Sequence, residues 1–254
     1  MPIGRPEATV AVIAHGAGST GRFVAEAFGP ALADAGIELV TFEDRSGDVS
    51  EVTATLAALV DGRGAQIVGG VSLGAHAAVA VAATRPWLAG AWLVLPAWTG
   101  PPGPVAALSA LAAAEVTRDG LDVVLARLRG GPGWGGWVVA ELRRAWPLYG
   151  EHSIAWALAA AAASPGPTAA VLAATGVRAG VVSVPADPFH PAEVARKWAS
   201  LLPAAAVVEL SDADLAGGPA ALGRAAVAAW SQLPAVAPSA GLGPGQGPAQ
   251  GSNR

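Results

Sequence analysis

A five-residue segment, Gly70-Val71-Ser72-Leu73-Gly74, constrains this chain more than any other part of its sequence. It has the pattern G-x-S-x-G and joins an apolar, strand-like run, 65–71, to an alanine-rich run typical of a helix, 73–84. A serine between two such elements lies on a sharp strand-to-helix turn, and the flanking glycines let backbone segments approach closely. The pattern predicts that Ser72 projects from the carboxyl end of a buried strand as a candidate nucleophile.

A second glycine-rich turn, His15-Gly16-Ala17-Gly18, follows another apolar run at 9–14. Together the two motifs resemble those of the α/β-hydrolase family. In that family a loop of the HG type supplies one backbone N–H to an oxyanion hole, and the residue after the serine supplies the other. The resemblance therefore implies that the amides of Ala17 and Leu73 are the oxyanion donors.

Strand-like and helix-like segments alternate along most of the chain, which is typical of a parallel sheet with helices on both faces. We therefore predict the α/β class and, by the resemblance, an α/β-hydrolase fold whose first strand corresponds to the family's third. The predicted strands are 9–14, 37–42, 66–71, 91–95, 180–184 and 206–210. The predicted helices are 22–35, 49–61, 73–84, 191–201 and 219–230.

The alternation stops between about residues 97 and 175, where helical segments are broken by Gly/Pro loops. The family inserts a helical cap at this place, so we expect a cap within one hydrolase domain, 1–234. The segment is rich in tryptophan, which is typical of packed helices: Trp98, Trp134, Trp137, Trp146 and Trp156. Residues 235–254 are Pro, Gly, Ser, Ala and Gln without periodicity, which predicts a disordered tail.

Asp187 follows the predicted strand 180–184 in a short loop before a helix. The resemblance places the acid of a catalytic triad there, in the chain order Ser, Asp, His. The alternative is that Asp187 only stabilises a turn or caps a helix.

The triad histidine is missing where the family has it, because the loop after the last strand, 211–218, contains none. We expect Asp212 or Asp214 to occupy that space with no imidazole in its place. A serine hydroxyl needs a neighbouring base, and an ordinary Asp, with a pKa of about 3.9, accepts protons poorly at neutral pH. The sequence therefore predicts weak hydrolysis of short esters.

His190, three residues after Asp187, is the strongest remaining candidate for a base. We expect the short spacing, which includes Pro188, to keep its far nitrogen away from Ser72. The substitution His190→Ala is then expected to change activity by less than tenfold.

The chain has three further histidines, for which we expect structural roles. His15 is expected to brace its loop, His76 to pack beneath the serine turn, and His152 to be a solvated residue of the cap. None has metal-ligand spacing, so we expect no metal. No organic cofactor is expected either.

Composition excludes several other classes of function. The chain has no cysteine, so it has no disulfide, thiolate metal site or cysteine nucleophile. Its net charge is −4 without a basic block, which argues against nucleic acid as the partner. There is no apolar run of about 18 residues and no secretory leader pattern at 1–8, so we expect a cytoplasmic protein without a membrane span.

The resemblance implies a carboxylesterase- or thioesterase-like serine hydrolase acting on a small-molecule ester or thioester with an apolar acyl group. His15, Gly16 and Trp98 are then expected to contact the substrate. The missing histidine leaves a non-catalytic scaffold open, one that binds an apolar ligand or partner.

A dinucleotide-binding protein is a third possibility. The segment Gly16-Ala17-Gly18-Ser19-Thr20-Gly21 also fits G-x-G-x-x-G, with Glu43 and Asp44 at the end of the next strand. That alternative leaves the motif at Ser72 and the loop at Asp187 unexplained.

Overall fold

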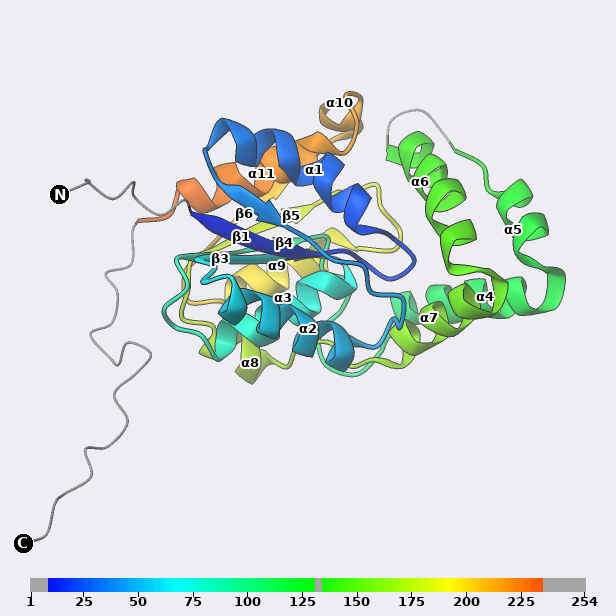
Figure 1. Cartoon of the computed structure of the whole chain (residues 1–254), viewed down its shortest axis with the longest axis horizontal. Coiled ribbons are helices and arrows are strands. Elements are labelled where there is room, and N and C mark those ends of the chain that lie inside the picture. The colour runs from blue at the N-terminus through cyan, green and yellow to red at the C-terminus, as the bar shows by residue number, and fades with distance from the viewer. Residues whose placement is uncertain (1–8, 131–133, 235–254) are drawn as a thin grey trace, which may run out of the picture.

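The computed structural model describes residues 9–130 and 134–234, so the predicted tail at 235–254 lies outside the described residues. The described part contains one six-stranded sheet, all parallel, in the order β2-β1-β3-β4-β5-β6 (Figure 1). The strands are β1 (Val10–Ala14), β2 (Glu38–Val40), β3 (Ile67–Val71), β4 (Gly90–Val94), β5 (Ala179–Ser183) and β6 (Ala205–Glu209). All six were predicted, but β2 is shorter than expected, because it is an edge strand paired over three positions with β1 alone.

Helices cover both faces of the sheet (Figure 1). One face carries α1 (Gly21–Asp34) and α11 (Ala220–Ser231), which pack against each other. The other carries α2 (Val49–Gly62), α3 (Leu73–Ala83), α8 (Ala169–Ala174) and α9 (Ala192–Leu201). A four-residue helix, α10 (Asp212–Leu215), follows β6.

The four central strands are buried along their whole length, as strands covered on both faces must be. Side chains alternate between two hydrophobic clusters because successive residues of a strand point to opposite faces. In β1, for example, Val12 joins the cluster under α2 and α3, whereas Ile13 joins the one under α1.

Four further helices lie beyond the carboxyl ends of the strands (Figure 1), and we call them the cap. They are α4 (Pro104–Asp119), α5 (Leu121–Arg127), α6 (Trp134–Tyr149) and α7 (Glu151–Ala163). The cap has its own apolar core, which includes Val116, Leu121 and Ile154.

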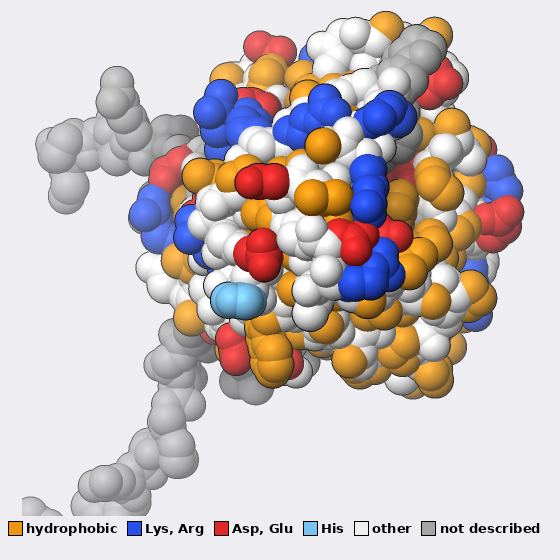
Figure 2. Space-filling model, turned by 90° about the vertical axis from the view of Figure 1, so that its right-hand side faces the viewer, with side chains coloured by type: hydrophobic (Ala, Val, Ile, Leu, Met, Phe, Trp, Pro, Cys, Tyr) orange, Lys and Arg blue, Asp and Glu red, His pale blue; other side chains and the backbone are white. Residues whose placement is uncertain are grey.

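Seen from the cap side, the surface mixes charged and hydrophobic side chains (Figure 2). Within the described residues, no helix is long and apolar enough to cross a membrane.

Candidate active site

Ser72 stands on a sharp turn between β3 and α3, as the sequence predicted. Its backbone has φ 55° and ψ −117°, a conformation that side-chain-bearing residues rarely adopt. The two glycines of the motif make the turn possible. A Cβ at position 70 would lie 2.1 Å from the carbonyl of Gly74, and one at position 74 would lie 2.5 Å from the carbonyl oxygen of Ala14. Neither position therefore has room for a side chain.

A hydrogen-bonded chain of three side chains is centred on His190. Its Nε2 lies 2.9 Å from Ser72 Oγ, and its Nδ1 lies 2.5 Å from Asp187 Oδ2. The Asp187 side chain is 1% exposed and the His190 ring 17% exposed. When Nδ1–H donates to the carboxylate, Nε2 is left as an acceptor for the serine hydroxyl. This is the order of groups that activates a serine nucleophile.

The expectation that no imidazole would reach Ser72 is therefore wrong. The second oxygen of Asp187, Oδ1, accepts a hydrogen bond of 2.8 Å from the Phe189 amide, so the loop folds back on the acid. That turn brings His190 beside Asp187 although only three residues separate them. The spacing Asp-x-x-His, with a turn-forming Asp-Pro pair, is the sequence signal that points to this arrangement.

The expectation for Asp212 and Asp214 is also wrong. Asp214 forms a capping box at α10, where its Oδ2 accepts hydrogen bonds from the Ser211 amide at 2.8 Å and the Ser211 hydroxyl at 2.7 Å. These bonds lower the pKa of Asp214, which makes it a still weaker base. Both carboxylates are exposed to solvent, and the imidazole beside Ser72 is that of His190.

His15 braces the loop that follows β1, as predicted. Its Nδ1–H donates to the Gly16 carbonyl at 2.8 Å, and its Nε2 accepts from the Asp44 amide at 3.0 Å. Both nitrogens are occupied, so this histidine is not available as a base. The loop lies against the serine, because a Cβ on Gly16 would be 3.7 Å from Ser72 Oγ.

The amides of Ala17 and Leu73 are the two that were expected to bind an oxyanion. Within the described residues, neither the Ala17 nor the Leu73 N–H has a hydrogen-bond partner. Leu73 is the first residue of α3, where amides lack partners inside the helix and the helix dipole favours negative charge.

His76 packs beneath the turn, as predicted. It is 2% exposed, its Nε2 accepts a 3.4 Å hydrogen bond from the Ala97 amide, and its ring meets Trp98 edge-on at 4.9 Å. Burial, and secondarily the charge of His190, lower the pKa of His76 to about 3. It is therefore a neutral, packed residue.

The other two predicted positions, Trp98 and His152, make no hydrogen bond to Ser72, His190 or Asp187 within the described residues. Trp98 is buried and donates from its indole nitrogen to the Ser164 carbonyl at 3.2 Å. His152 is exposed in the first turn of α7.

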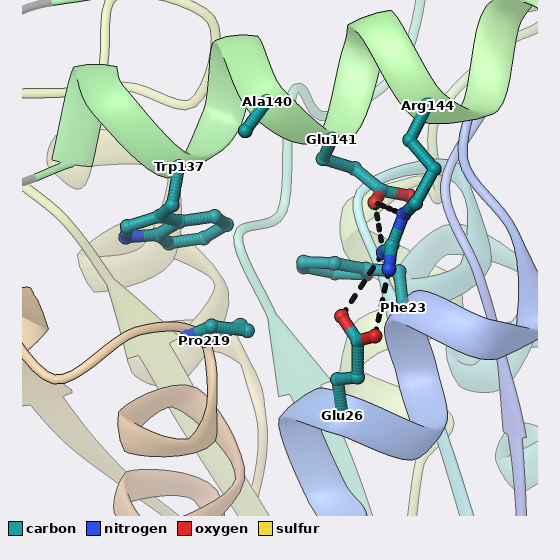
Figure 3. Close-up of a pocket in the computed structure, with 7 residues that line it drawn as sticks. All are labelled: Phe23, Glu26, Trp137, Ala140, Glu141, Arg144 and Pro219. Atoms are coloured by element: carbon teal, nitrogen blue, oxygen red, sulfur yellow. Dashed lines mark hydrogen bonds and ion pairs between the residues drawn. The ribbon is translucent and has the colours of Figure 1, made fainter.

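A shallow pocket of about 200 Å³ lies between α6 and α1 (Figure 3). None of the three hydrogen-bonded side chains lines it. Its walls combine apolar rings with an ion-pair network and come from Phe23, Glu26, Trp137, Ala140, Glu141, Arg144 and Pro219.

Two other kinds of site find no support in the geometry. Glu43 accepts a 2.9 Å hydrogen bond from the Gly21 amide, so a carboxylate already occupies the start of α1, where a dinucleotide would place its pyrophosphate. Among residues 9–130 and 134–234, no group of three or more His, Asp or Glu side chains is arranged to hold a metal ion.

Comparison with known proteins identifies the fold. No protein-family model matches the chain, and no curated protein matches its sequence. Among solved structures, Rv0554 from Mycobacterium tuberculosis superposes with a TM-score of 0.69 at 22% identity, covering 91% of this chain and 93% of that one. A hydrolase from Pseudomonas aeruginosa PA01 gives 0.69 at 19% identity, covering 89% and 91%. The enol-lactonase from Burkholderia xenovorans LB400 gives 0.66 at 17% identity, covering 81% and 84%.

These similarities and the strand order define the α/β-hydrolase fold. The described residues contain only the parallel part of its sheet, and the cap helices lie in the chain between β4 and β5.

Proposed function

We propose that this protein is a serine hydrolase that cleaves an ester or thioester with an apolar acyl group. The observation that carries the proposal is the continuous hydrogen-bonded chain from Ser72 Oγ through His190 to Asp187. A strained turn that presents the serine and a carboxylate that orients the imidazole are what nucleophilic catalysis requires.

In the proposed mechanism, His190 Nε2 takes the proton of the Ser72 hydroxyl as Oγ attacks the carbonyl carbon. Asp187 holds the imidazole in the required tautomer and stabilises its positive charge. The imidazolium then gives the proton to the leaving alcohol or thiol, and an acyl-serine remains. Water, deprotonated by the same nitrogen, hydrolyses this intermediate and restores the hydroxyl of Ser72.

The amides of Ala17 and Leu73 are the proposed oxyanion donors. Their lack of internal partners and the contact between Gly16 and Ser72 support this role. Donors of this kind contribute on the order of 3 kcal/mol each to transition-state stabilisation.

The choice of an apolar acyl group is supported by exposed hydrophobic side chains in the loop of the acid and base and on the cap. Phe189, next to His190 in the chain, exposes 45% of its surface. The cap also exposes large hydrophobic side chains, among them Leu111 of α4 and Trp156 of α7.

The proposal is tested with a serine-directed fluorophosphonate and a p-nitrophenyl ester such as the butyrate. We expect the wild-type protein to be labelled and to hydrolyse the ester, and Ser72→Ala to abolish both. An unlabelled wild-type protein, or a hydrolysis rate that survives Ser72→Ala, would instead favour the non-catalytic scaffold.

A further inference from the structure

The turn that carries the Ala17 amide is held by the cap. The Ser19 amide donates to the Gly16 carbonyl at 3.1 Å, which closes a four-residue turn with Ala17 and Gly18 at its centre. Gly18 has φ +68°, as the third residue of a type II turn requires. Fixing Ser19 therefore fixes the orientation of the Ala17 peptide.

Tyr149, the last residue of α6, binds the end of this turn. Its hydroxyl donates to the Ser19 carbonyl at 2.7 Å and lies 3.3 Å from the Asp44 carbonyl oxygen. Burial, and secondarily the nearby charges of Glu43 and Asp44, raise the pKa of Tyr149. The hydroxyl therefore remains a donor throughout the ordinary pH range.

The cap also covers the centre of the turn. A Cβ on Gly18 would lie 2.8 Å from the indole nitrogen of Trp146 and 3.3 Å from Ile154 Cδ1, so only glycine fits beneath α6 and α7. The centre of the turn therefore lies directly against side chains of the cap.

Glu141 provides a second connection from α6. Its Oε1 accepts hydrogen bonds from the hydroxyls of Ser19 at 3.4 Å and Thr20 at 3.3 Å. Arg144 holds this carboxylate from one side and pairs with Glu26 of α1 at 2.7 Å (Figure 3). The cap helix is thereby tied to the turn and to the helix that follows it.

We propose that Tyr149, assisted by Glu141, is a positioning residue that sets the Ala17 amide for oxyanion binding, so that catalysis depends on a docked cap. This inference rests on the proposed hydrolase function. It assigns to α6 a role in transition-state stabilisation in addition to covering the site.

The test is Tyr149→Phe, which removes only the hydroxyl, with Leu148→Ala as the matched control. Leu148 is the neighbouring residue of α6 and is 54% exposed. For each protein we would measure kcat and KM for a p-nitrophenyl ester, Ki for an alkyl trifluoromethyl ketone, and the melting temperature. The ketone forms a tetrahedral adduct with serine, so its affinity reports on the oxyanion donors.

For Tyr149→Phe we expect kcat to fall about tenfold and Ki to rise about tenfold, with KM within twofold, because only the transition state uses the donor fully. The control should match the wild type. A fall in kcat with an unchanged Ki would indicate lost folded protein and would overturn the inference. So would unchanged kcat and Ki.

Glu141 gives an independent test should Tyr149→Phe fail to fold. Glu141→Gln keeps an acceptor for the two hydroxyls, whereas Glu141→Leu removes it. We expect the Gln variant to stay within about threefold of the wild type and the Leu variant to show the same paired change in kcat and Ki. Equal Ki values for the two variants would contradict the inference. Failure of the proposed function itself looks different, because Ser72→Ala would then leave the wild-type rate intact.

Discussion

The serine turn and the acid–base loop meet at one hydrogen bond, yet they are built differently. The turn at 70–74 is fixed by backbone contacts, since Cβ atoms on either glycine would overlap neighbouring main-chain atoms. The loop at 184–190 has one backbone hydrogen bond, from the Asp187 amide to the Val184 carbonyl at 2.9 Å, but its far end is fixed by side-chain hydrogen bonds to the two oxygens of Asp187.

This difference explains why one region was easier to predict than the other. Backbone crowding demands glycine, which is visible in the sequence as G-x-S-x-G. A turn that is held by side-chain hydrogen bonds needs only suitable polar side chains, and a segment such as Asp-Pro-Phe-His also occurs in loops without a catalytic role. The loop should accordingly tolerate changes that spare its hydrogen bonds, whereas the turn should tolerate almost none.

The largest expected effect is that of His190→Ala. Since His190 is the base that touches Ser72, we now expect kcat for a p-nitrophenyl ester to fall at least about 10³-fold, as for Ser72→Ala. The double variant should be no worse than either single one, because the residues act as a unit. His152→Ala, a change in an exposed histidine, is the control and should leave the rate unchanged. A loss below tenfold for His190→Ala would show that the base lies elsewhere.

Asp187→Asn should have a smaller but still large effect. The amide can accept the Phe189 hydrogen bond but cannot stabilise a charged imidazole, and it favours the wrong tautomer. We expect kcat to fall about 10²-fold or more, with fluorophosphonate labelling slowed in parallel. A nearly normal rate would indicate that Asp187 only shapes the loop.

The contribution of the serine turn is tested by the free energy of unfolding. Gly74→Ala places a methyl group against the main chain of Ala14 and His15, so we expect the free energy of unfolding to fall by about 3 kcal/mol in urea titrations. Gly62→Ala, at the end of α2 with open space around it, is the matched control and should be neutral or stabilising by up to about 1 kcal/mol. Equal effects of the two substitutions would mean that the turn relaxes more easily than its contacts indicate.

The smallest effect concerns His76 and pH. Its pKa is about 3 when folded and 6.5 when unfolded, so below pH 6.5 the unfolded chain takes up a proton that the folded protein does not. Its contribution to stability is complete above pH 6.5 and falls by about 2 kcal/mol between pH 6.5 and pH 5. We expect His76→Phe to flatten the dependence of unfolding free energy on pH between 6.5 and 5. Parallel curves for the two proteins would contradict this.

The sequence predicted the strands and all but one of the helices that cover the sheet, because strands buried on both faces are short apolar runs that alternate with helical segments. The exception is α8, which lies within the segment 97–175 that was expected to form the cap. Ser72, the bracing role of His15 and the packing of His76 followed from local motifs. The pairing of His190 with Ser72 did not, since it depends on one side-chain turn and joins residues 118 positions apart. The hydrogen bond from Tyr149 to Ser19 joins residues 130 positions apart, and no local sequence pattern predicts it.

The placement of acid and base on one short loop has a mechanical consequence. Their mutual distance is set within a single stretch of chain after β5, so sliding or twisting of β6 against β5 does not alter it. Only the contact between His190 and Ser72 crosses between separate elements. Thermal motion of the sheet edge therefore reaches the proton-transfer path only through this one contact, and the exposed side chains of Asp212 and Asp214 after β6 can change without altering the base.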